Sequence, residues 1–163
     1  YWTKDDFFYD NPEFCSSTVL SIDGAVTVKK DSDFTGLAVV GFSPARNTSS
    51  GKQPARCVVK YARAVKMKGD RLRSLVLSIL ESYPEIRGIL VETNQGGDMW
   101  LDTSHGIPVK IYTIHNEEKK ESRAGRLLNL YQMAPTRVLH VQKIPRLEEE
   151  MINFPKGAKE YYS

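Results

Sequence analysis

The sequence lacks several features that would place it in a common functional class. It has no apolar run near the roughly 20 residues that a membrane helix requires. It contains neither a GxxxxGK[ST] phosphate-binding loop nor a GxSxG nucleophile turn. Its only cysteines, Cys15 and Cys57, are far apart, and no pair of cysteines or histidines has the spacing of zinc ligands. These absences argue against a helical membrane protein, a P-loop nucleotidase, a serine hydrolase and a zinc protein, and they favour free thiols in a reducing cytosol.

The start of the chain is polar and aromatic, and it lacks both an initiator Met and the features of a signal peptide. We therefore expect a fragment of a longer protein. The 163 residues are enough for one domain with a substantial core. Residues 1–17 are predicted to be a polar lead-in or linker remnant, and residues 18–163 to form the domain.

Acidic residues are also missing from one long stretch, which runs from Phe34 to Gly69. The basic residues in that stretch are Arg46, Lys52, Arg56, Lys60, Arg63, Lys66 and Lys68. A second basic group is Lys119, Lys120, Arg123 and Arg126. Either these residues form an ordinary solvated surface, or they form a face that binds a polyanion by neutralising its phosphates.

The pattern of apolar residues predicts three strands, a helix, and then alternating strands and helices. The first three strands are expected at 18–23, 34–43 and 56–66, with a long hairpin loop at 43–55. The later elements are a helix that ends near Tyr83 with Asp70 as its N-cap, a strand at 88–92, a helix within 96–105, a strand at 108–114, a helix at 117–133, an edge strand at 136–141 and a helix at 145–154.

This order of elements predicts the fold class. Three strands joined by hairpins form an antiparallel set, whereas strands separated by helices pair in parallel. We therefore expect an α/β protein with a mixed sheet of five to six strands flanked by helices, in which the first three strands are antiparallel. In such sheets, functional groups gather at the carboxyl ends of the strands.

Two carboxylates directly follow apolar strands. Asp23 follows TVLSI, and Glu92 follows GILV. If these strands are neighbours, both carboxylates lie at one end of the sheet, where their repulsion favours a hard cation such as Mg²⁺ or Mn²⁺. A hairpin would bring Asp33, at the start of the second strand, near Asp23. For each acid, a turn residue or an ordinary ion pair remains the alternative.

Four segments of the sequence, in the same order and spacing, resemble the C-terminal nuclease domain of phage terminase large subunits. They are SIDGAVTVKKDSDFTGLAVVGF, ILVETNQGGDMW, EEKKESRAGRLLNLY and LEEEMINFPKGAK. The resemblance extends over residues 18 to 160.

The resemblance implies a ribonuclease H-like fold and a metal-dependent endonuclease. Such an enzyme cuts concatemeric viral double-stranded DNA during genome packaging, using two divalent ions, Mg²⁺ or Mn²⁺. The implied partners are double-stranded DNA, the portal, the small terminase subunit and the terminase ATPase domain, which this sequence does not contain. The implied location is the host cytoplasm, at the procapsid and away from any membrane.

By this resemblance, Asp23 and Glu92 match catalytic metal ligands, and Asp33 matches an auxiliary acid beside the metals. The family has two Asp shortly after a Phe-Pro segment and another three residues later. Here that region reads FPKGAKEYYS, with Glu160 at the first acidic position and Tyr161 at the second. Glu160 is therefore the expected third ligand. The alternative is that this ligand lies beyond Ser163 and that the metal site of this chain is incomplete.

The basic residues are expected to contact DNA phosphates. They are Arg46, Lys52, Arg56, Lys60, Lys119, Lys120, Arg123 and Arg126. Phosphate contacts carry no base information, so cutting with little sequence preference is expected. Two other functions stay open. One is a different ribonuclease H-like enzyme, such as a junction resolvase or an integrase, and the other is a DNA-binding or portal-docking module that is not an enzyme.

Overall fold

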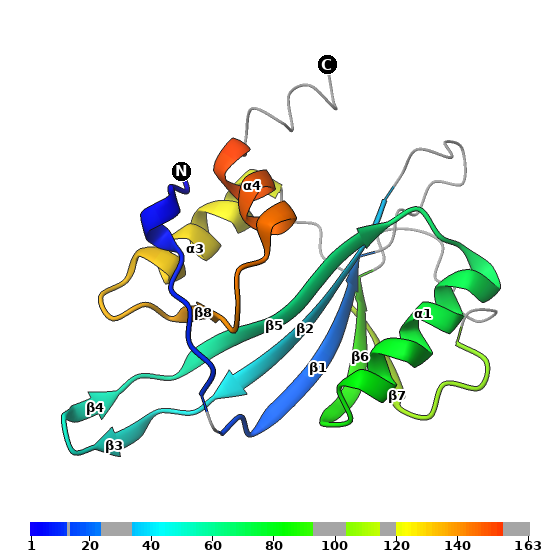
Figure 1. Ribbon diagram of the computed structural model, residues 1–163, viewed down its shortest axis with the longest axis horizontal. Coiled ribbons are helices and arrows are strands. Elements are labelled where there is room, and N and C mark those ends of the chain that lie inside the picture. Colours follow the sequence, from blue (N-terminus) through cyan, green and yellow to red (C-terminus); the bar gives the residue numbers. More distant parts are fainter. Residues whose placement is uncertain (13, 24–33, 93–103, 115–119, 155–163) are drawn as a thin grey trace. The chain divides into compact units, whose positions relative to one another are not determined.

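The computed structural model describes residues 1–12, 14–23, 34–92, 104–114 and 120–154 (Figure 1). Its main feature is a mixed sheet with the strand order β7-β6-β1-β2-β5-β8. The strands are β1 (Ser17–Asp23), β2 (Thr35–Ser43), β5 (Arg56–Val65), β6 (Ile86–Glu92), β7 (Lys110–Ile114) and β8 (Val138–His140). The described residues form three α-helices, α1 (Gly69–Ser82), α3 (Lys120–Gln132) and α4 (Pro145–Asn153), and a short 3-10 helix, η1 (Lys4–Asp6).

The directions of the strands agree with the sequence prediction. The first three long strands, β1, β2 and β5, are antiparallel. The pairs β1–β6, β6–β7 and β5–β8 are parallel. In the chain, α1 lies between β1 and β6, and α1 and α3 lie between β5 and β8, as expected for parallel pairs. The predicted α/β fold class, a mixed sheet of six strands with antiparallel first strands and flanking helices, is therefore confirmed, and the ribonuclease H-like assignment stays a prediction. The predicted helix within 96–105 falls mostly on residues outside the described part of the chain.

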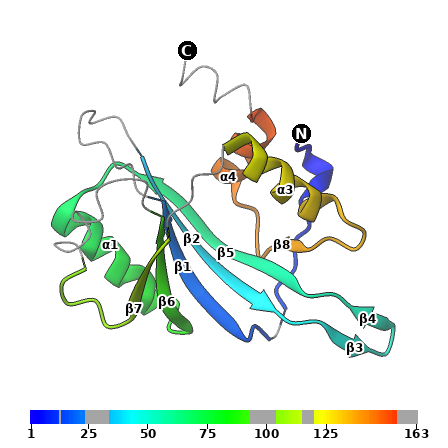
Figure 2. The same cartoon turned by 180° about the vertical axis from the view of Figure 1, so that it is seen from behind.

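The loop predicted at 43–55 contains a small sheet of its own. β3 (Arg46–Thr48) and β4 (Gly51–Gln53) pair antiparallel, and Figure 2 shows this hairpin continuing from the ends of β2 and β5. Gly51 has a φ of 123°, a backbone conformation that residues with a side chain rarely adopt. It lies where the chain turns back into β4. The side chains of Arg46 and Lys52 are exposed on this hairpin.

The chain forms two compact units, and β2 and β5 contribute residues to both. One unit comprises Ser17–Val40 and Arg63–Glu117. Its core lies between the sheet and α1, which runs alongside β6 in both views (Figures 1 and 2). The strands contribute Leu20, Ile22, Ile89 and Val91, all fully buried, and α1 contributes Leu72, Val76 and Ile79.

The start of α1 differs from the sequence prediction. Lys68 occupies the N-cap position, and Asp70 lies in the first turn, so the prediction that Asp70 caps the helix is wrong. The carboxylate of Asp70 instead lies 3.4 Å from the guanidinium of Arg73. An acid in the first turn still interacts favourably with the helix dipole, so it stabilises this end of α1 without being the cap.

The other unit comprises Tyr1–Ser16, Gly41–Ala62 and Glu118–Ser163. Trp2 and Phe7, which lie in the segment predicted as a polar lead-in, are buried here against Tyr131 and Val138. The rings of Trp2 and Phe7 meet the ring of Tyr131 edge to face, with centroid distances of 6.1 and 5.8 Å. Contacts of this kind add to the free energy gained from burying the apolar area. Where the domain begins stays a prediction, but the first residues of the chain belong to a core.

A buried polar cluster in this unit links the N-terminal segment to β8 and α4. His140 is fully buried, with Nε2 2.6 Å from the hydroxyl oxygen of Tyr131 and Nδ1 3.1 Å from Oε2 of Glu148. Glu148 also accepts hydrogen bonds from the hydroxyl of Tyr9 and from the amide of Ile144, the latter at 2.7 Å. An ionised carboxylate can only accept, so Nδ1 of His140 carries a proton that it donates to Glu148.

The cluster lowers the pKa of Glu148 and raises the pKa of its two tyrosines, Tyr9 and Tyr131. Burial by itself raises the pKa of Glu148, but the hydrogen bonds from Ile144, Tyr9 and His140 outweigh it, and the pKa lies below its ordinary value. Partial burial, the hydrogen bond to Glu148 and the negative charge of Glu148 together raise the pKa of Tyr9 to about 12. The folded chain therefore favours an ionised Glu148 beside a neutral Tyr9.

The depressed pKa of Glu148 predicts how stability depends on pH. A carboxyl group of this kind contributes stability above its unfolded pKa of about 4.3, and this contribution is lost as the pH falls through the folded pKa. We expect Glu148→Gln to lower the free energy of unfolding at pH 7 by about 1–3 kcal/mol. The difference from the wild type should shrink below about pH 4, as measured by urea unfolding at each pH. Glu149→Gln, an exposed neighbour on α4, is the control, and an equal loss in both variants would contradict the prediction.

Candidate metal and nucleic-acid site

The pairing of β1 with β6 places two of the predicted site residues side by side. Asp23 is the last residue of β1 and Glu92 the last of β6. The two strands are parallel, and the register aligns Ile22 with Val91 and Asp23 with Glu92. Because paired strands lie about 4.8 Å apart, the two carboxylates project from neighbouring positions at the carboxyl end of the sheet.

Both carboxylates lie on the face of the sheet opposite to the fully buried residues Ile22 and Val91. Side chains alternate along a strand, so Ile22 and Val91 point to one face and Asp23 and Glu92 to the other. The residues of the first face are fully buried. Asp23 is exposed and Glu92 half-buried, so the pair can be reached from solvent.

The chemistry of this pair fits a hard divalent cation. Like charges at directly opposed positions of neighbouring strands repel each other, and a bound cation turns that repulsion into attraction. Mg²⁺ and Mn²⁺ prefer oxygen ligands, and Mg²⁺ is commonly held by one or two carboxylates, with waters and substrate phosphates filling the other positions. Asp23 and Glu92 therefore match the number of protein carboxylates that commonly hold such an ion.

The other predicted acids fall outside the described residues. Asp33 lies in 24–33 and Glu160 in 155–163, so their predicted roles stay predictions. Within the part of the chain that the structure describes, no three His, Cys, Asp or Glu residues gather into a group that could hold a metal. The carboxylate pair is thus the observed part of the candidate metal site.

The predicted DNA contacts lie in the other compact unit. Arg46 and Lys52 are exposed on the β3–β4 hairpin, where Nε of Arg46 donates to Gln53 at 3.0 Å. Arg56 is buried, and Lys60 is half-buried.

On α3, Arg126 is exposed and Arg123 half-buried. Lys119 lies outside the described residues, and Lys120 begins α3. The structure brings Asp23 and Glu92 together within one unit, and it describes the basic residues separately, within the other.

The edge strand β7 carries a feature that sequence reasoning missed. Lys110 and Tyr112 are both exposed, and the ammonium of Lys110 lies 5.1 Å from the centre of the Tyr112 ring. The strand was predicted, but these two side chains were not considered as functional residues. Their alternation within KIYTI was the available signal, because it places both on one face of the strand.

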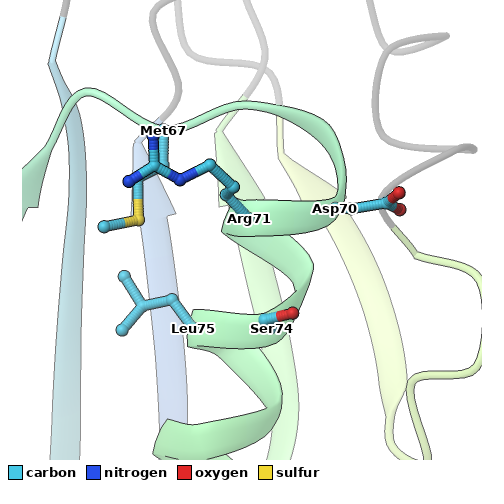
Figure 3. Close-up of a pocket in the computed structure, with 5 residues that line it drawn as sticks. All are labelled: Met67, Asp70, Arg71, Ser74 and Leu75. Carbon is cyan, nitrogen blue, oxygen red and sulfur yellow. The ribbon is translucent and has the colours of Figure 1, made fainter.

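A hollow at the first turns of α1 contains none of the predicted site residues. It has a volume of about 430 Å³ and is lined by Met67, Asp70, Arg71, Ser74 and Leu75. Figure 3 shows Met67, Arg71 and Leu75 on one side of the helix, with the carboxylate of Asp70 directed away from them. No chemistry is assigned to it.

Neither a protein-family model nor a curated protein matches the chain. Among solved structures, RuvC of Thermus thermophilus is similar, with a TM-score of 0.48 and 16% identity over 82% of this chain and 89% of that chain. RuvC of T. thermophilus in complex with a Holliday junction substrate gives a TM-score of 0.45 and 14% identity over 82% and 88%.

None of the helices in the described residues is both long and apolar enough to cross a membrane.

The carboxylate pair predicts that Mn²⁺ stabilises the fold. At roughly ten times the dissociation constant, a ligand that binds only the folded chain adds about 1.4 kcal/mol, or about 3 to 6 °C in Tm. We expect this rise for the wild type and for Glu81→Gln, an exposed acid on α1. Asp23→Asn and Glu92→Gln should lose most of it in differential scanning calorimetry. A full rise in both of these variants would show that Mn²⁺ binds elsewhere.

Proposed function

We propose that the chain is a metal-dependent endonuclease that cleaves DNA and uses Asp23 and Glu92 as metal ligands. The observation that carries this proposal is the register of β1 and β6, which aligns the two carboxylates at the carboxyl end of the sheet. An α/β sheet with functional groups at that end is a common arrangement for an active site. Two solvent-accessible carboxylates at paired strand positions can share a divalent cation.

The protein's own residues have separable tasks in this proposal. Asp23 and Glu92 hold negative charge at a defined point, and the buried face behind them keeps their strands in register. Asp33 and Glu160 are proposed to complete the acidic set. When bound, a pair of divalent ions supplies an activated water and stabilises charge on the leaving 3′ oxygen.

The basic residues are proposed to hold the DNA through its phosphates. The exposed side chains of Arg46 and Lys52 extend along the β3–β4 hairpin, and Arg126 is exposed on α3. Such contacts position a duplex and strengthen its binding at low salt, but they do not read its sequence. Arg56 is buried, so we assign it to the support of the hairpin base and not to direct contact.

We further propose that the cleavage serves genome packaging in a tailed phage, as the nuclease part of a terminase large subunit. The support is the order of four sequence motifs between residues 18 and 160. The partners in this case are concatemeric double-stranded DNA, the ATPase domain, the portal and the small subunit, in the host cytoplasm. A preference for branched DNA would instead indicate a resolvase or integrase. DNA binding without cleavage in any divalent metal would indicate a docking module.

Substitution of the carboxylates tests the endonuclease proposal. Asp23→Asn and Glu92→Gln should each lower the rate of plasmid cleavage in Mn²⁺ by at least about 100-fold. The reason is that metal ions supply several kcal/mol of charge stabilisation in the transition state, and 1.36 kcal/mol corresponds to a factor of ten in rate. The measurement is the conversion of supercoiled plasmid to nicked and linear forms on a gel.

The matched control for this experiment is Glu81→Gln, which changes an exposed acid on α1 and should cleave like the wild type. Circular dichroism of each variant checks that the fold is retained. If Asp23→Asn cleaves at the wild-type rate, Asp23 is not a metal ligand and the proposed function fails.

The predicted phosphate contacts also determine the cutting pattern. Because the proposed contacts carry no base information, a linear plasmid should be cut into a continuous distribution of fragments, without bands. Sequencing of the fragment ends checks this result. Discrete fragments that share a common end sequence would show that the chain reads bases.

A further inference from the structure

The edge strand β7 presents its exposed side chains beside the carboxylate pair. β7 pairs with β6 in parallel, and the register aligns Gly88 with Lys110, Leu90 with Tyr112, and Glu92 with Ile114. Directly paired residues point to the same face of a sheet. Lys110 and Tyr112 therefore share a face with Glu92 and Asp23, and all four residues belong to the same compact unit.

Gly88 determines how the ring of Tyr112 lies on this face. A Cβ atom at position 88 would be 3.3 Å from Cε2 of Tyr112 and 3.4 Å from the carbonyl oxygen of Lys110. The ring therefore occupies the space that a side chain on β6 would take, and it leans across the sheet instead of pointing away from it. The Tyr112 side chain is still 47% exposed, although its ring lies close to Gly88 of β6.

Lys110 adds a positive charge to the same place. Its ammonium lies 5.1 Å from the centre of the Tyr112 ring, which is within the range of a cation–π contact. An accessible ring together with a cation is the combination that binds single-stranded nucleic acids, where bases stack on aromatic side chains and basic groups follow the phosphates. A purely acidic partner would interact only with Lys110, and a purely apolar partner only with the Tyr112 ring.

The distance to the carboxylates matches a neighbouring nucleotide. Tyr112 pairs with Leu90, two residues before Glu92, and two residues of a strand span about 6.6 Å. With a strand spacing of about 4.8 Å, the Cα atoms of Tyr112 and Glu92 are about 8 Å apart. Since nucleotides in a stacked DNA strand rise by about 3.4 Å each, a strand whose phosphate lies at the carboxylates reaches Tyr112 within a few nucleotides.

We propose that Lys110 and Tyr112 form a contact for an unpaired nucleotide of the DNA strand that flanks the scissile phosphate. The proposal rests on the proposed function, because it takes Asp23 and Glu92 as the place of cleavage. Tyr112 stacks on the base, and Lys110 contacts a phosphate of the same strand. A base within an intact duplex is stacked on its neighbours and costs a few kcal/mol to extrude, whereas an unpaired base costs least. The site therefore prefers DNA that is frayed, nicked or mismatched near the cut.

Binding of a reporter DNA tests this contact. The probe is a short duplex with one unpaired 2-aminopurine nucleotide, whose fluorescence falls when the base stacks, and the buffer contains Ca²⁺, with a gel to confirm that the DNA stays uncut. The wild type should quench the probe and bind it more tightly than a fully paired duplex. Tyr112→Leu should bind the probe about 5- to 150-fold more weakly without quenching it. Its affinity for the paired duplex should change by less than twofold.

Three matched variants separate stacking from other effects. Tyr112→Phe keeps the ring and should behave like the wild type. Phe42→Leu removes an exposed ring on β2 and should leave binding of the probe unchanged. Lys110→Gln should weaken binding to both DNAs and lower the slope of log affinity against log salt by about 1.

Two results would overturn the inference. One is equal quenching by Tyr112→Leu and the wild type. The other is that Tyr112→Leu changes the mass of the protein in solution but leaves its affinity for the probe unchanged. That result would make β7 a contact between two copies of the chain. Either result leaves the endonuclease proposal standing if Asp23→Asn still abolishes plasmid cleavage. Wild-type cleavage by Asp23→Asn would instead refute the proposed function and this inference with it.

Discussion

The parallel pairing of β1 with β6 is the constraint on which the candidate site depends. It aligns Asp23 with Glu92, and it is held by a fully buried layer that includes Ile22 and Val91. The apolar residues and the carboxylates alternate along the same two strands, so one face is buried and contributes to folding while the other presents the two carboxylates. Buried apolar residues therefore determine the distance between the two acidic groups.

Much of this arrangement could be predicted from the sequence, because it follows from local patterns. Apolar runs gave the long strands, three- and four-residue spacing gave α1 and α3, and a helix between two strands implied their parallel pairing. The adjacency of Asp23 and Glu92 was a consequence of those rules and of one assumption, that their strands are neighbours. The roles of Asp33 and Glu160 came from resemblance alone and remain predictions.

Several missed features depend on tertiary contacts or cap geometry that local sequence patterns do not mark. The polar cluster around His140 was not predicted, because its partners Tyr131 and Glu148 lie on two different helices and Tyr9, which donates to Glu148, lies near the start of the chain. The aromatic residues of the first segment were read as part of a polar lead-in, since no periodicity marks their burial. Asp70 was mistaken for a helix cap because its residue type is favoured there, although α1 begins one residue before it.

The alternation of β6 has a consequence for how this protein can vary in length. A deletion or insertion of one residue between Ile86 and Val91 would turn Glu92 toward the buried face and bring an apolar side chain into its place. A one-residue change in the length of the hairpin at Arg46–Gln53 has no such effect, because the side chains of this hairpin are largely exposed. Sequence change in the family of this chain should therefore accumulate as length differences in the hairpin, whereas β6 changes only by substitution or in steps of two residues.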